Sequence, residues 1–324
     1  MALFFFVVGL EIKRELVDGE LRDRRVAALP ALAALGGMVV PALLYLAWTA
    51  GSSAQRGWGI PMATDIAFAV GVLALLGARA STPLKLFVLT LAVVDDIGAI
   101  VVIAIFYARD FNVAWLAGAL GVVAIIVLLR RFATRPIIYV LPAIVLWVCV
   151  HESGVHPTIA GVALGLLTPT HTSRATRPAL QLEHRLDPVA SFMVVPLFAL
   201  ANAGIRVTAE SLHHAATSAV AWGVLVGLVV GKFLGVFGAT TLGERLHLGR
   251  LPDRMTRRDL AGGAAVAGIG FTVALFVASL AFDANRQYLT DAKLAILLAS
   301  VVAALFATVV LTTTASRHDA SGKK

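Results

Sequence analysis

The chain has 324 residues, of which 59% are hydrophobic and only 14% are charged, and its mean hydropathy is +0.88. Soluble domains contain about half apolar and about a quarter charged residues, so this composition excludes a soluble globular protein and predicts a polytopic membrane protein. The net charge of +8 does not indicate a nucleic-acid partner, because the basic residues fall in short gaps between apolar runs.

Eleven apolar runs are candidate membrane spans, since about 20 mostly apolar residues cross the hydrocarbon core. They cover roughly residues 1–17, 27–50, 59–78, 84–107, 113–129, 136–151, 155–169, 188–205, 218–240, 260–282 and 290–314. The prediction is one all-α membrane domain over residues 1–314 and a polar cytoplasmic tail over 315–324. The first run has neither the basic start nor the cleavage site of a signal peptide. We expect it to be a partial span that a further helix precedes.

Basic residues are distributed unequally between the gaps on the two sides of these spans. One side collects 21 Lys and Arg and the other 5, while Lys232 remains inside an apolar run. Cytoplasmic loops carry the excess of Lys and Arg, so the richer side and the C-terminus are predicted to be cytoplasmic.

Four ionisable residues stand at mid-span depth: Asp65, Asp95, Asp96 and Lys232. Charges at this depth are costly and therefore predict function. Asp95 and Asp96 are about 100° apart around a helix, so one can face a partner while the other faces a cavity. Two ionised carboxylates would repel each other, so the pair titrates as a unit that holds a proton or a small cation in turn. The alternative is that both are structural and are satisfied by hydroxyls and backbone.

Lys232 lies beside a ridge of small residues, because Gly227, Gly231 and Gly235 recur at every fourth position. Such a ridge lets another helix approach closely. We expect the buried ammonium to pair with an aspartate, which the sequence does not identify. The alternative is a purely structural salt bridge.

Two apolar segments carry helix breakers, one in each half of the chain. Pro61 precedes the polar pair Thr64 and Asp65, and Gly268 and Gly270 interrupt a late span. Paired interruptions of this kind are typical of transporters built from inverted repeats. Asp65 would then neutralise the positive starts of half-helices, and Lys232 the negative ends. For the two glycines the alternative is ordinary packing between helices.

The side chains of Thr64, Asp65, Asp95 and Asp96 offer only oxygen, which suits hard cations. The predicted ligand is therefore Na+, Li+ or H+, as a transported ion, and no cofactor is expected. An intramembrane aspartyl protease using Asp65 and Asp95 is a rival, but the GxGD signature is absent and Lys232 has no role there. A retinal pump is disfavoured by eleven spans and 8% aromatic residues. The third rival is a cation channel or a carrier of another substrate, and among these another monovalent-cation antiporter is the serious competitor.

Several long stretches resemble one known family: VVGLEIKREL (7–16), GGMVVPALLYLA (36–47), ATDIAFAVGVLALLG (63–77), LAVVDDIGAI (91–100), SGVHPTIAGV (153–162), LEHRLDP (182–188), PLFALANAG (196–204), GKFLGV (231–236) and GIGFTVALFVASLAF (268–282). They are similar, nearly end to end, to the bacterial NhaA Na+/H+ antiporter family. This implies an inverted-repeat fold with two broken, crossing helices in the inner membrane. The family is itself a known example of that arrangement, so the broken-helix prediction is not independent of it.

The resemblance implies an electrogenic exchanger that expels Na+ or Li+, takes in a larger number of protons and switches on as pH rises. It makes Asp96 the central cation ligand and proton carrier, and Asp95 a second ligand or the partner of Lys232. Thr64 joins the Na+ ligands, and with Asp65 it lies where the broken helices cross.

The resemblance also places pH sensing in a set of charged residues, namely Glu11, Arg14, Glu15, Glu183, His184 and His156. For His156, an ordinary hydrogen-bonded histidine is the open alternative. The sequence departs from the family in having LDP at 186–188, where a further histidine is expected. The family's first helix and its β-hairpin for homodimerisation are not in this sequence, so the dimer is doubtful. Membrane lipid is the other expected partner.

Overall fold

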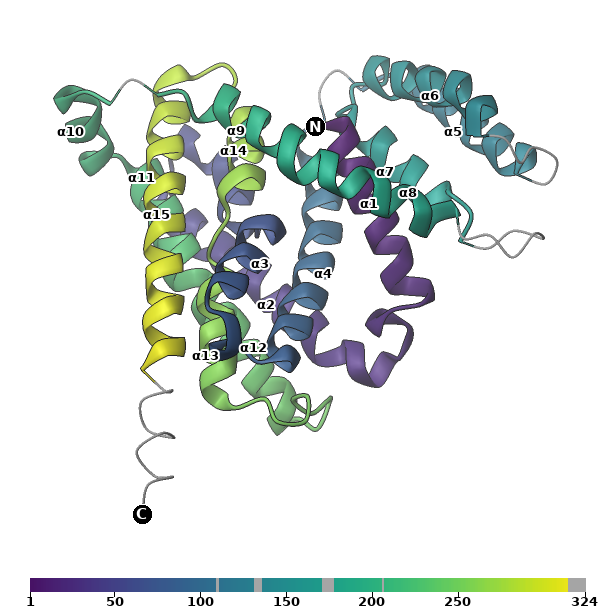
Figure 1. Cartoon of the computed structure of the whole chain (residues 1–324). Helices are drawn as coiled ribbons and strands as arrows, with labels where there is room; N and C mark the ends of the chain where they lie inside the picture. The colour runs from purple at the N-terminus through teal and green to yellow at the C-terminus, as the bar shows by residue number, and fades with distance from the viewer. Residues whose placement is uncertain (109–110, 131–135, 171–177, 206, 314–324) are drawn as a thin grey trace. The chain divides into compact units, whose positions relative to one another are not determined.

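The computed structural model describes residues 1–108, 111–130, 136–170, 178–205 and 207–313, so the predicted tail lies outside the described residues. These residues form helices and no strand, as Figure 1 shows. The α-helices are Ala2–Val17 (α1), Arg24–Trp48 (α2), Ile66–Leu75 (α3), Thr82–Phe106 (α4), Val113–Leu129 (α5), Val140–Glu152 (α6), Thr158–Leu167 (α7), Pro178–Val189 (α8), Val195–Ala203 (α9), Ala209–Thr217 (α10), Ala219–Val226 (α11), Lys232–Arg245 (α12), Arg257–Val266 (α13), Phe271–Ala281 (α14) and Arg286–Thr312 (α15). The 3₁₀ helices are Glu20–Arg22 (η1), Ser53–Met62 (η2), Gly77–Arg79 (η3) and Pro136–Tyr139 (η4), and the π-helices are Ala190–Val194 (η5) and Gly227–Gly231 (η6).

The predicted all-α membrane fold is confirmed. Among the described residues, five helical stretches are long and apolar enough to cross a membrane, and two further pairs of helices qualify as bent spans. Three shorter apolar helices, α5, α6 and α7, also coincide with predicted spans. Each of the eleven predicted runs overlaps a helix or a bent pair, although the number of spans and the single domain over 1–314 stay predictions.

The contacts divide the chain into two compact units, and the first contains residues 1–22 and 100–199. In it α1 packs closely against α7. A Cβ atom added at Gly9 would lie 2.6 Å from the Val162 carbonyl oxygen, and one at Gly165 would lie 2.6 Å from that of Phe6. Helices meet this closely in membranes where small residues line the contact, because packing rather than hydrophobicity drives their association.

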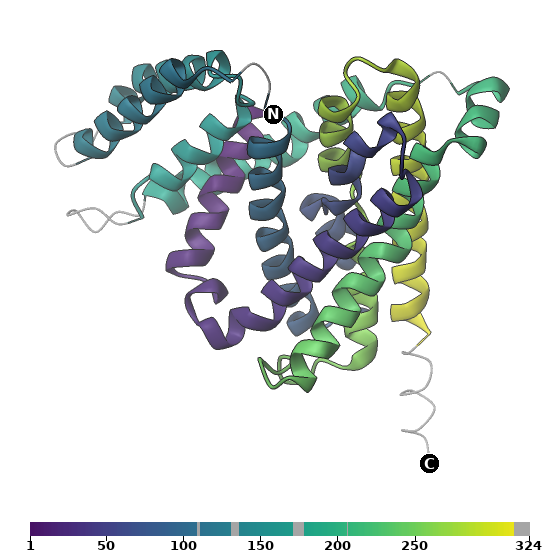
Figure 2. The same cartoon turned by 180° about the vertical axis from the view of Figure 1, so that it is seen from behind.

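The second unit contains residues 23–99 and the described residues from Leu200 onward. Its long helices α2 and α12 run side by side, as Figure 2 shows from behind. The predicted glycine ridge faces α2. A Cβ atom at Gly231 would lie 2.8 Å from the Pro41 Cα, and one at Gly235 would clash with the Gly36 carbonyl oxygen. This close approach brings the start of α12, and therefore Lys232, against α2.

Two helix starts in the second unit are set by local side chains. Thr256 and Asp259 form a reciprocal capping box at the start of α13, and the Asn285 side chain accepts from the amides of Gln287 and Tyr288 at the start of α15. Figure 1 shows α15 running beside α13. Fully buried side chains such as Leu73 and Leu260 fill the interior of this unit. The packed interior fixes the broken helices that carry the candidate site.

Candidate functional site

The first broken span consists of η2 and α3, which are bent by 45°. The break lies at residues 63–65, where Ala63 and Asp65 adopt extended backbone conformations. Pro61 lies just before it and has no amide hydrogen for a helical bond, which favours ending the helix there. The break therefore leaves Thr64 and Asp65, both buried, with backbone groups that need partners outside a helix.

The second broken span consists of α13 and α14, bent by 43°, with Gly268 and Gly270 in the break. Other backbone lies too close for a side chain at either position. A Cβ atom at Gly268 would lie 2.6 Å from the Leu228 carbonyl oxygen, and one at Gly270 would lie 2.9 Å from that of Ala63. Glycine is thus required at both positions, at Gly268 because the backbone of η6 lies against it and at Gly270 because the two breaks touch.

Hydrogen bonds join the two breaks directly. The Asp65 amide donates to the Ile269 carbonyl oxygen at 2.7 Å, and the Thr64 hydroxyl donates to that of Ala267 at 2.9 Å. The predicted crossing of two broken helices is therefore present in the fold.

The Asp65 carboxylate caps the half-helices on both sides of this crossing. Its Oδ1 accepts from the Phe68 amide at 3.2 Å, at the start of α3. Its Oδ2 accepts from the Thr272 amide at 2.8 Å and from the Thr272 hydroxyl at 2.5 Å, at the start of α14. A carboxylate is stabilising at a helix start because the unpaired amides there carry partial positive charge. Thr272 was not anticipated, although its place two residues after Gly270 is a usable signal.

Asp95, on α4, is held by one of its two oxygens. Oδ2 accepts from the Lys232 ammonium at 2.7 Å and from the Thr64 amide at 2.8 Å. Both side chains of the Asp95–Lys232 pair are fully buried. Oδ1 is also buried and accepts no hydrogen bond from the described residues. This arrangement identifies Asp95 as the partner of Lys232 and leaves one carboxylate oxygen for another ligand.

Asp96 is also buried, and it lies close enough to Lys232 to interact with it electrostatically. Lys232 is the first residue of α12 and directly follows the π-helix η6. π-Helical turns inside α-helices occur often at functional sites. Two adjacent carboxylates and one ammonium thus meet beside the crossing, with more negative than positive charge when all three are ionised.

A second charged cluster lies in the first unit, where Arg14 contacts three carboxylates. Arg14 Nη2 lies 3.1 Å from Glu15 and 3.9 Å from Glu11, and Nη1 donates to Glu183 of α8. Glu15 and Glu183 are buried. The adjacent His184 is exposed and interacts electrostatically with Glu183. The structure therefore brings together the residues that the sequence predicted as a pH-sensing set, His156 excepted.

His156 lies in the turn between α6 and α7. Its Nδ1 accepts from the Thr158 amide at 3.3 Å and lies 2.9 Å from the Thr158 hydroxyl. Nδ1 can accept from an amide only when it carries no proton, so this contact requires the neutral imidazole. The geometry is that of a cap on the first turn of α7.

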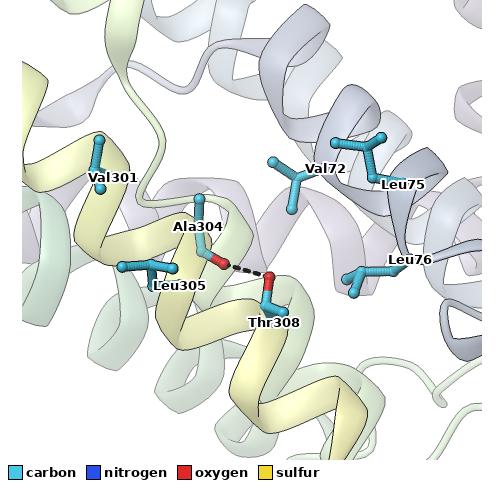
Figure 3. Close-up of a pocket in the computed structure, with 7 residues that line it drawn as sticks. All are labelled: Val72, Leu75, Leu76, Val301, Ala304, Leu305 and Thr308. Carbon is cyan, nitrogen blue, oxygen red and sulfur yellow. Dashed lines mark hydrogen bonds between the residues drawn. The ribbon is translucent and has the colours of Figure 1, made fainter.

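A surface pocket between α3 and α15 is separate from these charged residues. Figure 3 shows the side chains that line it, Val72, Leu75, Leu76, Val301, Ala304, Leu305 and Thr308. The only polar one, Thr308, donates its hydroxyl to the Ala304 carbonyl oxygen at 2.8 Å. The pocket therefore offers no charged ligand for a cation, and the candidate site is the crossing with Asp95 and Asp96.

Broken spans that meet over buried carboxylates and a buried lysine are features of ion-coupled membrane transporters. The family model described as Na+/H+ antiporter 1 matches residues 1–311, and the chain belongs to this family. The chain is 48% identical to a Novosphingobium aromaticivorans protein named Na+/H+ antiporter NhaA 2. The 314 aligned residues cover 96% of this chain and 80% of that protein. The chain is also 48% identical over 307 residues to the Na+/H+ antiporter NhaA of an Enterobacter species, covering 94% and 78%. The family resemblance seen in the sequence is confirmed, and the chain is a transporter of the antiporter class.

Proposed function

We propose that the chain is an electrogenic antiporter that expels Na+ or Li+ and takes in a larger number of protons at one shared aspartate site. The observation that supports this is the buried pair Asp95 and Asp96, of which Asp95 keeps one oxygen without a hydrogen bond from the described residues. Carboxylate oxygens bind both protons and hard cations. Competition between the two for the same oxygens gives exchange when the site opens to each side of the membrane in turn.

In the proposed cycle, the cytoplasm-facing site loses its protons and binds Na+ through Asp96, Asp95 and Thr64. The change in charge favours the outward-open state, where protons displace Na+. When more than one proton enters for each Na+, positive charge moves inward. The membrane potential then contributes about 2.3 kcal/mol for each net charge per 100 mV.

The proposed pH sensor is the cluster around Arg14. Three carboxylates share this one guanidinium, and two of them, Glu15 and Glu183, are buried. With more than one of its carboxylates ionised, the cluster holds more negative charge than the single guanidinium compensates. The resulting repulsion would move α1 against α8 and activate the transporter at alkaline pH.

We also propose a multi-pass protein of the bacterial inner membrane with a cytoplasmic C-terminus, in line with the uneven distribution of its 27 Lys and Arg. Membrane lipid is then its surrounding partner, and a homodimer is the assembly that the family resemblance implies.

Ion exchange by the chain in proteoliposomes tests the proposal. A pH gradient is imposed across the membrane, a pH-sensitive dye is trapped inside, and chloride salts of Na+, Li+, K+ or choline are added. Na+ and Li+ should dissipate the gradient, faster at alkaline than at acidic pH, while K+ and choline should not. A membrane potential set with K+ and valinomycin should change the rate.

Empty liposomes provide the baseline for this measurement. A rate that does not respond to the potential would overturn the electrogenic cycle and leave antiport intact. No Na+-dependent proton movement above the baseline would overturn the proposed function as a whole.

The two interpretations of His156 can be separated by substitution. The contact with the Thr158 amide favours a neutral cap, so His156→Asn, which keeps a side-chain acceptor, should leave the pH profile of exchange unchanged. His156→Ala should lower the stability of the protein by about 1 kcal/mol, the usual value of a lost helix cap. Thermal unfolding in detergent and the proteoliposome assay measure the two effects. A displaced pH profile in His156→Asn would instead establish a sensing role.

A further inference from the structure

Helix α14 begins without a side-chain cap from its own N-cap residue. Its N-cap residue is Gly270, which has no side chain to accept a hydrogen bond. The Asp65 Oδ2 atom takes that place from the other break, accepting from the Thr272 amide at 2.8 Å. Since Asp65 also caps α3, one carboxylate serves the starts of two half-helices, and it lies 207 residues before Thr272 in the sequence.

The Thr272 hydroxyl adds a third bond to this carboxylate. A threonine inside a helix commonly donates to the carbonyl oxygen four residues earlier. Thr240 does so, with its hydroxyl 2.7 Å from the Val236 carbonyl oxygen. Thr272 has no intact helical turn before it, because the break lies there, and its hydroxyl donates to Asp65 Oδ2 at 2.5 Å. Its side chain is buried, so water does not compete for the carboxylate.

The orientation of Asp65 bears on the ion site through its neighbour in the chain. The Thr64 amide donates to Asp95 Oδ2 at 2.8 Å, the same oxygen that accepts from Lys232. The Asp65 carboxylate ties the break to the starts of α3 and α14, so loss of this tie would free the backbone of the break and let the adjacent Thr64 amide shift. Asp95 would then lose one of the two donors that hold its carboxylate in place.

We propose that Thr272 is a positioning residue for ion binding, which holds Asp65 between the two half-helices and thereby fixes the Thr64 amide against Asp95. This inference rests on the proposed function, because its effect is seen as Na+ affinity. Thr272 acts through Asp65 and does not bind the ion.

The test compares Thr272→Val, which keeps the shape of the side chain and removes the hydroxyl, with Thr272→Ser, which keeps the hydroxyl. Thr272→Val should raise the KM for Na+ roughly tenfold, the effect expected from the loss of one hydrogen bond to a charged group. The maximal exchange rate of Thr272→Val should change by a smaller factor than its KM. Weaker Na+ binding lets protons compete better, so activation should move to more alkaline pH. Thr272→Ser should stay close to the wild type.

The matched control is Thr240→Val, because Thr240 is equally buried and its hydroxyl bonds only within its own helix. In an Asp65→Asn background, Thr272→Val should have a much smaller further effect, since the charged acceptor is gone. If Thr272→Val does not fold, Thr272→Ala provides the same comparison without the branched side chain.

The outcomes separate this inference from the proposed function. Absent exchange in the wild type overturns the proposed function. A wild type that exchanges Na+ while Thr272→Val and Thr240→Val have the same KM and pH profile overturns the role of Thr272 alone. An equal effect of Thr272→Val with and without Asp65→Asn also overturns it, because Thr272 would then act without Asp65.

Discussion

Replacing Asp96 with asparagine is expected to abolish Na+-dependent proton movement, reducing it to the level of empty liposomes. The asparagine side chain has nearly the same shape, but it stays neutral and cannot bind and release a proton in the pH range of the assay. It also presents one amide oxygen to Na+ in place of a charged carboxylate. The proteoliposome assay measures the proton movement, and ²²Na+ uptake measures the cation arm independently.

The matched control for Asp96→Asn is Asp291→Asn. Asp291 is a fully buried carboxylate in the same unit, but its partners are His214 Nδ1 at 3.1 Å and Gln287 Nε2 at 3.3 Å. This variant should retain exchange, because neither partner belongs to the crossing. Wild-type exchange in Asp96→Asn would remove Asp96 from the proposed site, and loss of exchange in both variants would point to a general intolerance of buried carboxamides.

The positions of most helices follow from the sequence because the signal is local. An apolar run of sufficient length in lipid must satisfy its own backbone, and a helix does so. The run predicted at 113–129 coincides with α5. For the run predicted at 188–205 the predicted start is too late. The helix begins at Pro178, and its first part is the polar helix α8. A hydropathy pattern marks only the apolar part of such a helix, so it does not predict the polar end.

The breaks were also predictable, and for the same reason. Pro61 cannot donate a backbone hydrogen bond, and the glycines at 268 and 270 lower the helical propensity of a late span. A local sequence pattern does not identify which distant residue a buried charged side chain pairs with. Asp95 and Lys232 are 137 residues apart, and three aspartates were equally available to the lysine on sequence grounds.

Thr272 illustrates the limit more clearly. Threonine is unremarkable in a membrane helix, and its role here depends on Asp65, 207 residues away in the chain. The cluster around Arg14 could be predicted in part from the sequence. Glu11, Arg14 and Glu15 share one helix face by spacing, whereas the contact with Glu183 spans 169 residues. Residue types thus indicate which chemistry a site can perform. Which residues contact one another at the site depends on the tertiary fold.

Replacing Lys232 with methionine is expected to lower the free energy of unfolding by about 3–5 kcal/mol, the cost of breaking a buried ion pair from one side. Lys232 and Asp95 are both fully buried and lie 2.7 Å apart, so removing the ammonium leaves an uncompensated charge in an apolar interior. Methionine fills a similar volume, which keeps the packing against α2 nearly unchanged. Denaturant unfolding of the detergent-solubilised protein measures the effect.

The double variant Lys232→Met with Asp95→Asn should recover much of that stability, because both charges leave together and the asparagine oxygen still accepts from the Thr64 amide. The control is Arg257→Gln, which breaks a pair with Glu244 whose arginine is 54% exposed. An exposed pair contributes up to about 1 kcal/mol, so this variant should unfold almost like the wild type. If Lys232→Met cost no more than Arg257→Gln, Asp95 would carry no charge in the folded protein. Lys232 would then not compensate a negative charge on Asp95 at the crossing.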